Sequence, residues 1–116
     1  MTDVDLWWAE ARNPAARLVD LLDDEERPRL DRFVRPEDRD RFLVAHALAR
    51  LVVADALRVT PADVRFDRSC ARCGAAHGKP QVVPTHGPAY VSLTHSGRWV
   101  GVALCATGPV RTGRVT

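Results

Sequence analysis

The clearest pattern in the chain is the recurrence of apolar residues at spacings of three and four between residues 36 and 58. The apolar positions of this segment are Phe42, Ala45, Leu48, Ala49, Val52, Val53, Ala56 and Leu57. Such spacing predicts one long helix, starting at Pro36, whose wide apolar stripe is buried. Its alanines would let neighbouring elements approach closely. This helix is therefore the predicted centre of the fold.

The residues before the long helix predict three shorter elements. The run VDLWWAEA (4–11) has an apolar centre between acidic flanks, which favours a first strand. Asn13 and Pro14 then resemble an N-cap and the first position of a short helix with leucines on one face. In DDEERPRLDRFV (23–34) the acids precede the bases, the order that complements a helix dipole, so a second short helix is expected.

After the long helix the pattern changes from helical spacing to short extended runs. VTPADVRF (59–66) predicts a capped turn followed by a strand at 64–66. QVV (81–83) predicts another short strand between polar loops. YVSLTHSGRWVGVAL (90–104) predicts a hairpin whose turn lies at His95-Ser96-Gly97. A polar cluster at the tip of an otherwise apolar hairpin suggests a binding function there.

Composition and charge narrow the class of protein. The 116 residues are 46% hydrophobic, enough for one domain with a modest core. Seventeen basic residues oppose 15 acidic ones, and a net charge of +2 argues against a nucleic-acid partner. No apolar run approaches the roughly 18 residues of a membrane span. Three cysteines, two of them in CARC, fit a reducing compartment. A cytoplasmic protein without membrane contact is expected.

Two short motifs have the composition of phosphate sites. In HGKP, Gly78 allows close backbone approach to an anion, Lys79 supplies a charge, and Pro80 fixes the chain beyond it. In THSG, Thr94 and His95 are followed by a further hydroxyl and a glycine, all able to donate to phosphate oxygens. Taken singly, each motif is also typical of an ordinary solvated turn.

Arginines gather where the long helix begins. Arg35, Arg39 and Arg41 could face a single anion, but they alternate with three acidic residues. The alternative is therefore a solvated face of mutual ion pairs. His46 lies inside the long helix and is interpreted as structural.

The loop that follows residue 67 contains potential metal ligands. Cys70, Cys73, His77 and His86 are four such side chains, yet their spacing matches no established zinc module, and two reduced loop cysteines are the alternative. No acidic residue follows Asp67, so the C-terminal part offers no carboxylates to a divalent metal.

Together the motifs, in this order, resemble the 4'-phosphopantetheinyl transferases of the larger, surfactin-synthetase-activating type. The matching segments are RFVRPEDRDRFLVAHALARLVV, VTPADVRF, HGKP and YVSLTHSGRWVGVAL. In the family the last motif usually contains Asn-Leu-Ser-His-Ser, where this chain has VSLTHS. The resemblance implies an α+β fold, one half of a pseudodimer, with a small antiparallel sheet packed on the long helix. It covers only the N-terminal half of the family.

The resemblance also implies a reaction. A serine hydroxyl of an acyl or peptidyl carrier protein attacks the β-phosphate of coenzyme A, takes the phosphopantetheine arm and releases 3',5'-ADP. Coenzyme A lies between the two halves, with Mg²⁺ on its pyrophosphate. The metal neutralises charge, and the enzyme aligns the nucleophile with phosphorus.

Site residues can be carried over by position. Lys79 is expected to contact a coenzyme A phosphate and His95 the 3'-phosphate, while Thr94 occupies the usual serine position. The other cofactor-binding candidates are Gly78, Pro80, Arg39 and Arg41. Arg29 matches one of two positions that carry lysine in some relatives, and Glu26 occupies the other.

The family's metal-binding and catalytic motifs have no counterpart in this sequence. Residues 1–110 match the N-terminal half-domain, and RTGRVT (111–116), a divergent tail, stands where the family has Gly-Val-Asp-Ile-Glu. The Mg²⁺ ligands and all catalytic residues are thus missing. The leading hypothesis is a truncated, inactive N-terminal half that carries part of the coenzyme A site. The alternatives are a non-catalytic coenzyme A or phosphate-binding half that docks a complementary C-terminal half, and a small zinc-binding module.

Overall fold

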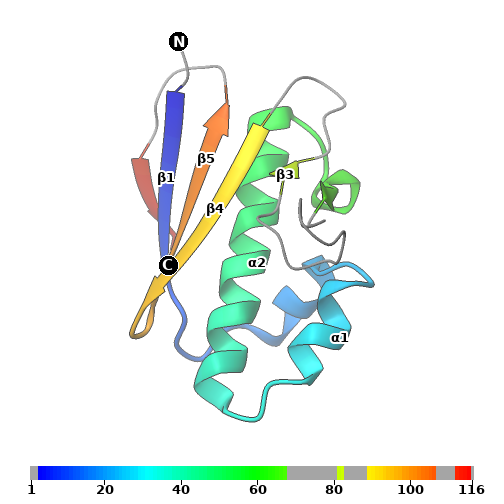
Figure 1. The fold of residues 1–116 in the computed structure, drawn as a ribbon, viewed down its shortest axis with the longest axis vertical. Coiled ribbons are helices and arrows are strands. Elements are labelled where there is room, and N and C mark those ends of the chain that lie inside the picture. Colours follow the sequence, from blue (N-terminus) through cyan, green and yellow to red (C-terminus); the bar gives the residue numbers. More distant parts are fainter. Residues whose placement is uncertain (1–2, 68–80, 83–88, 107–111, 116) are drawn as a thin grey trace, which may run out of the picture.

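A computed structural model describes residues 3–67, 81–82, 89–106 and 112–115, and these form a six-stranded sheet with helices (Figure 1). The strands are β1 (Asp3–Glu10), β2 (Phe66–Asp67), β3 (Gln81–Val82), β4 (Ala89–Ser96), β5 (Trp99–Ala106) and β6 (Thr112–Val115). Their order across the sheet is β2-β3-β4-β5-β1-β6. Only the β1–β6 pair is parallel among the pairings of these strands.

The predicted long helix is confirmed as α2 (Pro36–Leu57). It begins with proline, whose missing N–H costs nothing in the first turn, and ends where Arg58 adopts a left-handed φ of 56°. The helix runs along the sheet and contacts β1, β4 and β5 (Figure 1). Val53 of α2 and Val100, Val102 and Leu104 of β5 are almost completely buried between these two layers. The core is therefore the interface of α2 with the central strands.

The two short helices before α2 span fewer residues than the segments that predicted them, and the predicted turn after α2 is present. They are the 3-10 helix η1 (Ala16–Leu21), the α-helix α1 (Glu26–Asp31) and the 3-10 turn η2 (Pro61–Asp63). Asn13 is not the N-cap of η1, because its φ of 50° is left-handed whereas an N-cap is extended. Ala15, in the extended region, precedes the helix instead.

The hairpin is confirmed, but its turn lies further along the chain than predicted. β4 continues through His95 to Ser96, and Ser96 pairs with Trp99. Only Gly97 and Arg98 form the turn. Gly97 has a φ of 57°, so a glycine at the first central position suffices for a two-residue loop. His95 therefore belongs to a strand, with a fixed side-chain direction.

The segment 111–116, predicted as a divergent tail, contributes the short strand β6. Residues 112–115 pair with Leu6 through Ala9 of β1. The sequence analysis predicted no strand here, because four residues are too few to show an alternating pattern. With β6 included, the α+β fold of a sheet packed on a long helix is confirmed. No helix in the described ranges is long and apolar enough to cross a membrane.

Gly101 marks a close approach on the sheet face opposite α2. A Cβ atom at this position would lie 2.7 Å from Cζ3 of Trp8 and 2.9 Å from Cγ2 of Thr94. These residues form one row across the sheet, since Gly101 pairs with both Trp8 and Thr94. The Trp8 indole therefore rests on a position where only glycine leaves room.

We expect Gly101→Ala to destabilise the chain by about 1–2 kcal/mol, because the added methyl group overlaps the Trp8 ring. Urea unfolding followed by tryptophan fluorescence measures this loss. In a Trp8→Ala background the same substitution should cost less, by at least about 0.5 kcal/mol. Strictly additive losses would contradict the overlap.

Candidate functional site

A cavity of about 210 Å³ lies between α2 and β4, and we call it the α2–β4 cavity. Its lining combines apolar walls with imidazole, guanidinium and carboxylate groups. The lining residues are Phe33, Asp38, Arg41, Phe42, Ala45, His46, Leu93, Thr94 and His95. It thus brings both predicted residues of the hairpin motif, Thr94 and His95, next to the N-terminal half of α2.

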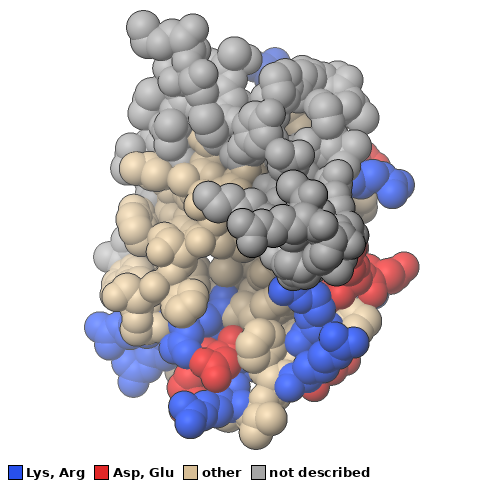
Figure 2. Space-filling model, in the orientation of Figure 1, with Lys and Arg blue, Asp and Glu red and all other residues tan. Residues whose placement is uncertain are grey.

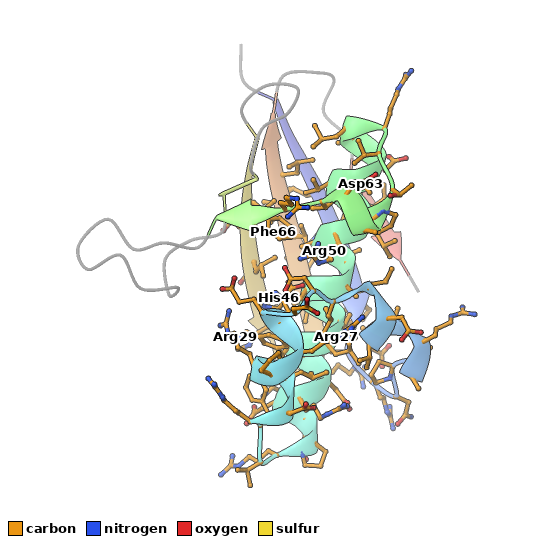
Figure 3. The ribbon with its side chains drawn as sticks, turned by 90° about the vertical axis from the view of Figure 1, so that its right-hand side faces the viewer. Arg27, Arg29, His46, Arg50, Asp63 and Phe66 are labelled. Carbon is orange, nitrogen blue, oxygen red and sulfur yellow. The ribbon has the colours of Figure 1, made fainter. Side chains whose placement is uncertain are left out.

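One wall of the α2–β4 cavity is aromatic. Phe42 and His46 are one turn apart on α2, and their rings stack with centroids 4.0 Å apart and an interplanar angle of 26°. Phe33 packs against Phe42 at 5.2 Å, and the guanidinium carbon of Arg29 lies 5.3 Å from the Phe42 ring centroid. Figure 3 shows His46 directly above α1, the helix that carries Arg29. A cation–π contact therefore holds Arg29 beside this wall.

Thr94 and His95 project from opposite faces of β4. Leu93 packs against the core beneath the sheet, and His95, two residues further on, shares its face. Thr94 lies instead with Trp8 and Gly101 on the outer face. The imidazole of His95 thus faces α2, whereas the methyl group of Thr94 packs on the other side of the sheet.

Of the predicted arginines, Arg41 lies at the cavity and Arg39 does not. Arg41 forms an ion pair with Asp38, and its Nη1 donates to the carbonyl of Gly97 at 3.1 Å. It therefore ties the first turns of α2 to the hairpin tip. Arg39 lines none of the cavities next to Arg41. Figure 2 shows basic and acidic side chains close together at the end of the molecule where α2 begins. The Arg41–Asp38 pair is one of the mutual ion pairs expected there.

Several predicted site residues lie outside the described part of the chain. They are Gly78, Lys79 and Pro80 of HGKP and the candidate zinc ligands Cys70, Cys73, His77 and His86. Within the described ranges, no group of three His, Cys, Asp or Glu side chains is placed to hold a metal ion. Neither the HGKP motif nor the zinc alternative is tested by the fold.

Beneath the α2–β4 cavity lies a buried ion pair between Arg50 of α2 and Glu26 of α1. Arg50 Nε donates to Glu26 Oε1 at 2.7 Å, and the two residues are 1% and 0% exposed. Arg50 also donates to Asp23 Oδ2 at 2.5 Å and to the carbonyl of Val64 at 2.6 Å. Its guanidinium carbon lies 5.1 Å from the Phe66 ring centroid, and Figure 3 shows these two residues together. One arginine therefore joins α1, α2 and the segment leading into β2.

Glu26 and Asp23 start α1 through reciprocal hydrogen bonds. The backbone N–H of Glu26 donates to Asp23 Oδ1 at 2.8 Å, and the N–H of Asp23 donates to Glu26 Oε1 at 3.0 Å. This is the geometry of a capping box. The second carboxylate oxygen of Glu26 lies 3.0 Å from Nδ1 of His46. The interpretation of His46 as structural is thus supported by a direct partner.

Glu26 remains ionised although it is buried. Burial alone raises the pKa of Glu26. Hydrogen bonds from His46, from the backbone of Asp23 and from Arg50 lower it, as does the charge of Arg50. These effects outweigh burial, and the pKa falls from 4.5 to about 2. An ionised carboxylate only accepts hydrogen bonds. Glu26 is therefore a fixed acceptor beside His46 at neutral pH.

The sequence analysis missed the aromatic wall and the role of Glu26. Phe42 and His46 are separated by four residues, the spacing that places two side chains on one helix face. Asp23 and Glu26 have the three-residue separation of a capping box. Both signals are present in the sequence, but neither indicates which other element these side chains contact.

The fold and cavity can now be set beside known proteins. The family described as "4'-phosphopantetheinyl transferase, N-terminal" matches residues 7–107. The chain belongs to this family. The match includes α2, the hairpin and every residue that lines the α2–β4 cavity. The resemblance inferred from the sequence is confirmed for the N-terminal part of the family.

Individual relatives agree with this assignment. A phosphopantetheinyl transferase of Thraustochytrium sp. is 39% identical over 94 residues, covering 80% of this chain and 31% of that protein. The 4'-phosphopantetheinyl transferase Sfp of Bacillus subtilis is 31% identical over 78% of this chain and 36% of its own length. HetI of Nostoc sp. is 31% identical over 94% of this chain and 44% of its own. The chain thus spans less than half the length of these relatives.

We expect Glu26→Gln to lower the free energy of unfolding at pH 7 by roughly 3 kcal/mol, because it leaves Arg50 buried without its carboxylate. The pKa of Glu26 is lowered on folding, so its ionised form stabilises the fold fully above about pH 4.5. That stabilisation declines as the pH falls toward 2. The difference between wild type and variant should therefore shrink over this interval.

Urea unfolding at several pH values between 7 and 2.5 measures the effect. Glu37→Gln is the matched control, since Glu37 is exposed in the first turn of α2 and its loss should cost no more than about 0.5 kcal/mol. A constant difference between wild type and Glu26→Gln across this pH interval would contradict the lowered pKa.

Proposed function

We propose that this chain is the N-terminal half of a 4'-phosphopantetheinyl transferase and forms one wall of its coenzyme A site. The complete enzyme would transfer the phosphopantetheine arm of coenzyme A to a serine of an acyl or peptidyl carrier protein. The observation that carries the proposal is the α2–β4 cavity in a chain of this family, which His95 and Arg41 both line and beside which Arg29 contacts Phe42. These groups suit an anionic ligand.

In this proposal the phosphates of coenzyme A are held mainly by His95, Arg29 and Lys79. His95 is exposed on β4 and opens into the cavity, where its ring can reach a phosphate oxygen. Arg29 supports it from α1 beside the aromatic wall. Lys79, with Gly78 and Pro80, would contribute from the HGKP motif. The Thr94 side chain faces away from α2, and the register directs its backbone groups toward Gly101 of β5, so Thr94 is given no direct phosphate contact in this proposal.

Among the described residues, those that line the cavity do not fit Mg²⁺. Asp38, the carboxylate that lines the cavity, is paired with Arg41. No acidic residue follows Asp67 in the sequence. In this proposal the metal-binding carboxylates come from a complementary C-terminal half. Transfer requires attack on phosphorus and compensation of charge on the pyrophosphate, and this half supplies only binding. By itself the chain would bind coenzyme A and catalyse no transfer.

The test is titration calorimetry of the whole chain with coenzyme A. Wild type should bind, and His95→Ala or Lys79→Ala should each weaken binding by about tenfold, the size of one hydrogen bond to a charged group. Arg17→Ala is the matched control for Arg29→Ala, because Arg17 is an exposed arginine on η1 away from the cavity lining. Of these two arginine variants, Arg29→Ala should weaken binding and Arg17→Ala should not.

Incubation of the chain with coenzyme A, Mg²⁺ and an apo carrier protein, followed by mass spectrometry of the carrier, should show no added phosphopantetheine. Wild-type heats equal to those of buffer would overturn the proposed coenzyme A site. Equal affinities of wild type, His95→Ala and Lys79→Ala would also overturn it. Transfer by this chain alone would show that the missing acids are not required.

A further inference from the structure

We infer that His46, through its Nε2 atom, is an additional phosphate-binding residue of the α2–β4 cavity that determines selectivity for a ligand carrying a phosphomonoester. This inference rests on the proposed function. It concerns a side chain inside the long helix that no motif assigns to binding. Three observations carry it: the orientation of the ring, its rigid support, and the groups opposite.

The orientation follows from Glu26. His46 Nδ1 lies 3.0 Å from Glu26 Oε2, and the ionised carboxylate can only accept a hydrogen bond. Nδ1 must therefore carry the proton, which fixes the tautomer of the neutral ring. Nε2 is then the second polar atom, and within the described ranges the one hydrogen bond of the ring is that of Nδ1 with Glu26. Because the ring lines the α2–β4 cavity, Nε2 is the polar atom it can offer to a ligand.

The ring is held in place from two sides. Its side chain is only 11% exposed, and it stacks on Phe42 at 4.0 Å. Glu26, which fixes the other side, is itself held by Arg50 Nε and by the backbone of Asp23. A ligand contact at Nε2 would therefore need no rearrangement of the side chain, which favours affinity.

The groups that face His46 suit a phosphate oxygen. Glu26 contacts the ring from α1, Arg41 and Asp38 line the same cavity from α2, and His95 lines it from β4. Arg50, on the next turn of α2, neutralises Glu26. Arg29 lies across Phe42. Because the neutral ring carries its proton on Nδ1, Nε2 presents a lone pair, which accepts the hydroxyl proton of a phosphomonoester monoanion.

Substitution of His46 by asparagine or by glutamine separates the two ring nitrogens. The shorter amide of His46→Asn would lie near the position of Nδ1 and keep a donor to Glu26, but it leaves nothing at Nε2. The probes are coenzyme A and 3'-dephospho-coenzyme A, whose affinities are measured by calorimetry for wild type, His46→Asn and His46→Gln. We expect His46→Asn to reduce the preference for coenzyme A by about tenfold. His46→Gln, which places its amide near Nε2, should retain more of that preference.

Thermal unfolding of His46→Asn and His46→Gln shows whether a change in ligand preference comes from a loss of stability. His46→Asn should be no less stable than His46→Gln beyond the few tenths of a kcal/mol in which their helix propensities differ, because the asparagine amide keeps the bond to Glu26. A preference that is unchanged in folded His46→Asn overturns the role of His46 and leaves the proposed function standing. A wild type that does not distinguish the two ligands overturns the phosphate site, and this inference with it. Loss of preference in His46→Asn and its retention in His46→Gln support the inference.

Discussion

The buried pair of Arg50 and Glu26 is the interaction on which the rest of this half-domain depends. Two fully buried charges are tolerated only when they are paired and their other hydrogen-bonding groups are satisfied. Here Arg50 reaches three segments of the chain, and both carboxylate oxygens of Glu26 have partners. The pair therefore fixes the position of α1 on α2 more narrowly than apolar packing would, because its geometry admits few alternatives.

The candidate site depends on this fixed position of α1 on α2. α1 has only six residues, too few for a helix that is stable in isolation, so its position must come from contacts with the rest of the chain. Those contacts are the capping box at Asp23, the ion pair at Glu26 and the burial of Leu30. Once α1 is held, Arg29 and His46 both contact the Phe42 ring. The buried polar network next to the cavity thus fixes the position of the cavity's aromatic wall.

The sequence predicted the elements whose signal is local and repeated. The stripe from Phe42 to Leu57 indicated α2, and the alternating run after residue 90 indicated the hairpin. The sequence did not predict features that depend on very few residues or on partners far away in the chain. β6 has only four residues, and the turn shifted because Gly97 alone provides the required backbone conformation. Glu26 was noted as an unusual residue at a basic position, yet its partners lie 20 and 24 residues away. Contacts between residues so far apart in the sequence produce no periodic pattern from which they could be predicted.

The edge of β4 explains how a hairpin can present polar groups beside a core. β3 pairs with β4 only at Ala89 and Tyr90, so from Val91 to Ser96 this edge of β4 has no strand partner among the described residues. The α2–β4 cavity lies along that open stretch, at Leu93, Thr94 and His95. Unpaired backbone groups at a sheet edge must find another partner or remain solvated. The register makes Thr94 a hydrogen-bonded partner of Gly101 in β5, so the backbone groups directed at the open edge are those of Val91, Leu93 and His95. A ligand in the cavity can therefore meet the backbone and the imidazole of His95 at once. A turn at the same position would not give His95 this fixed direction.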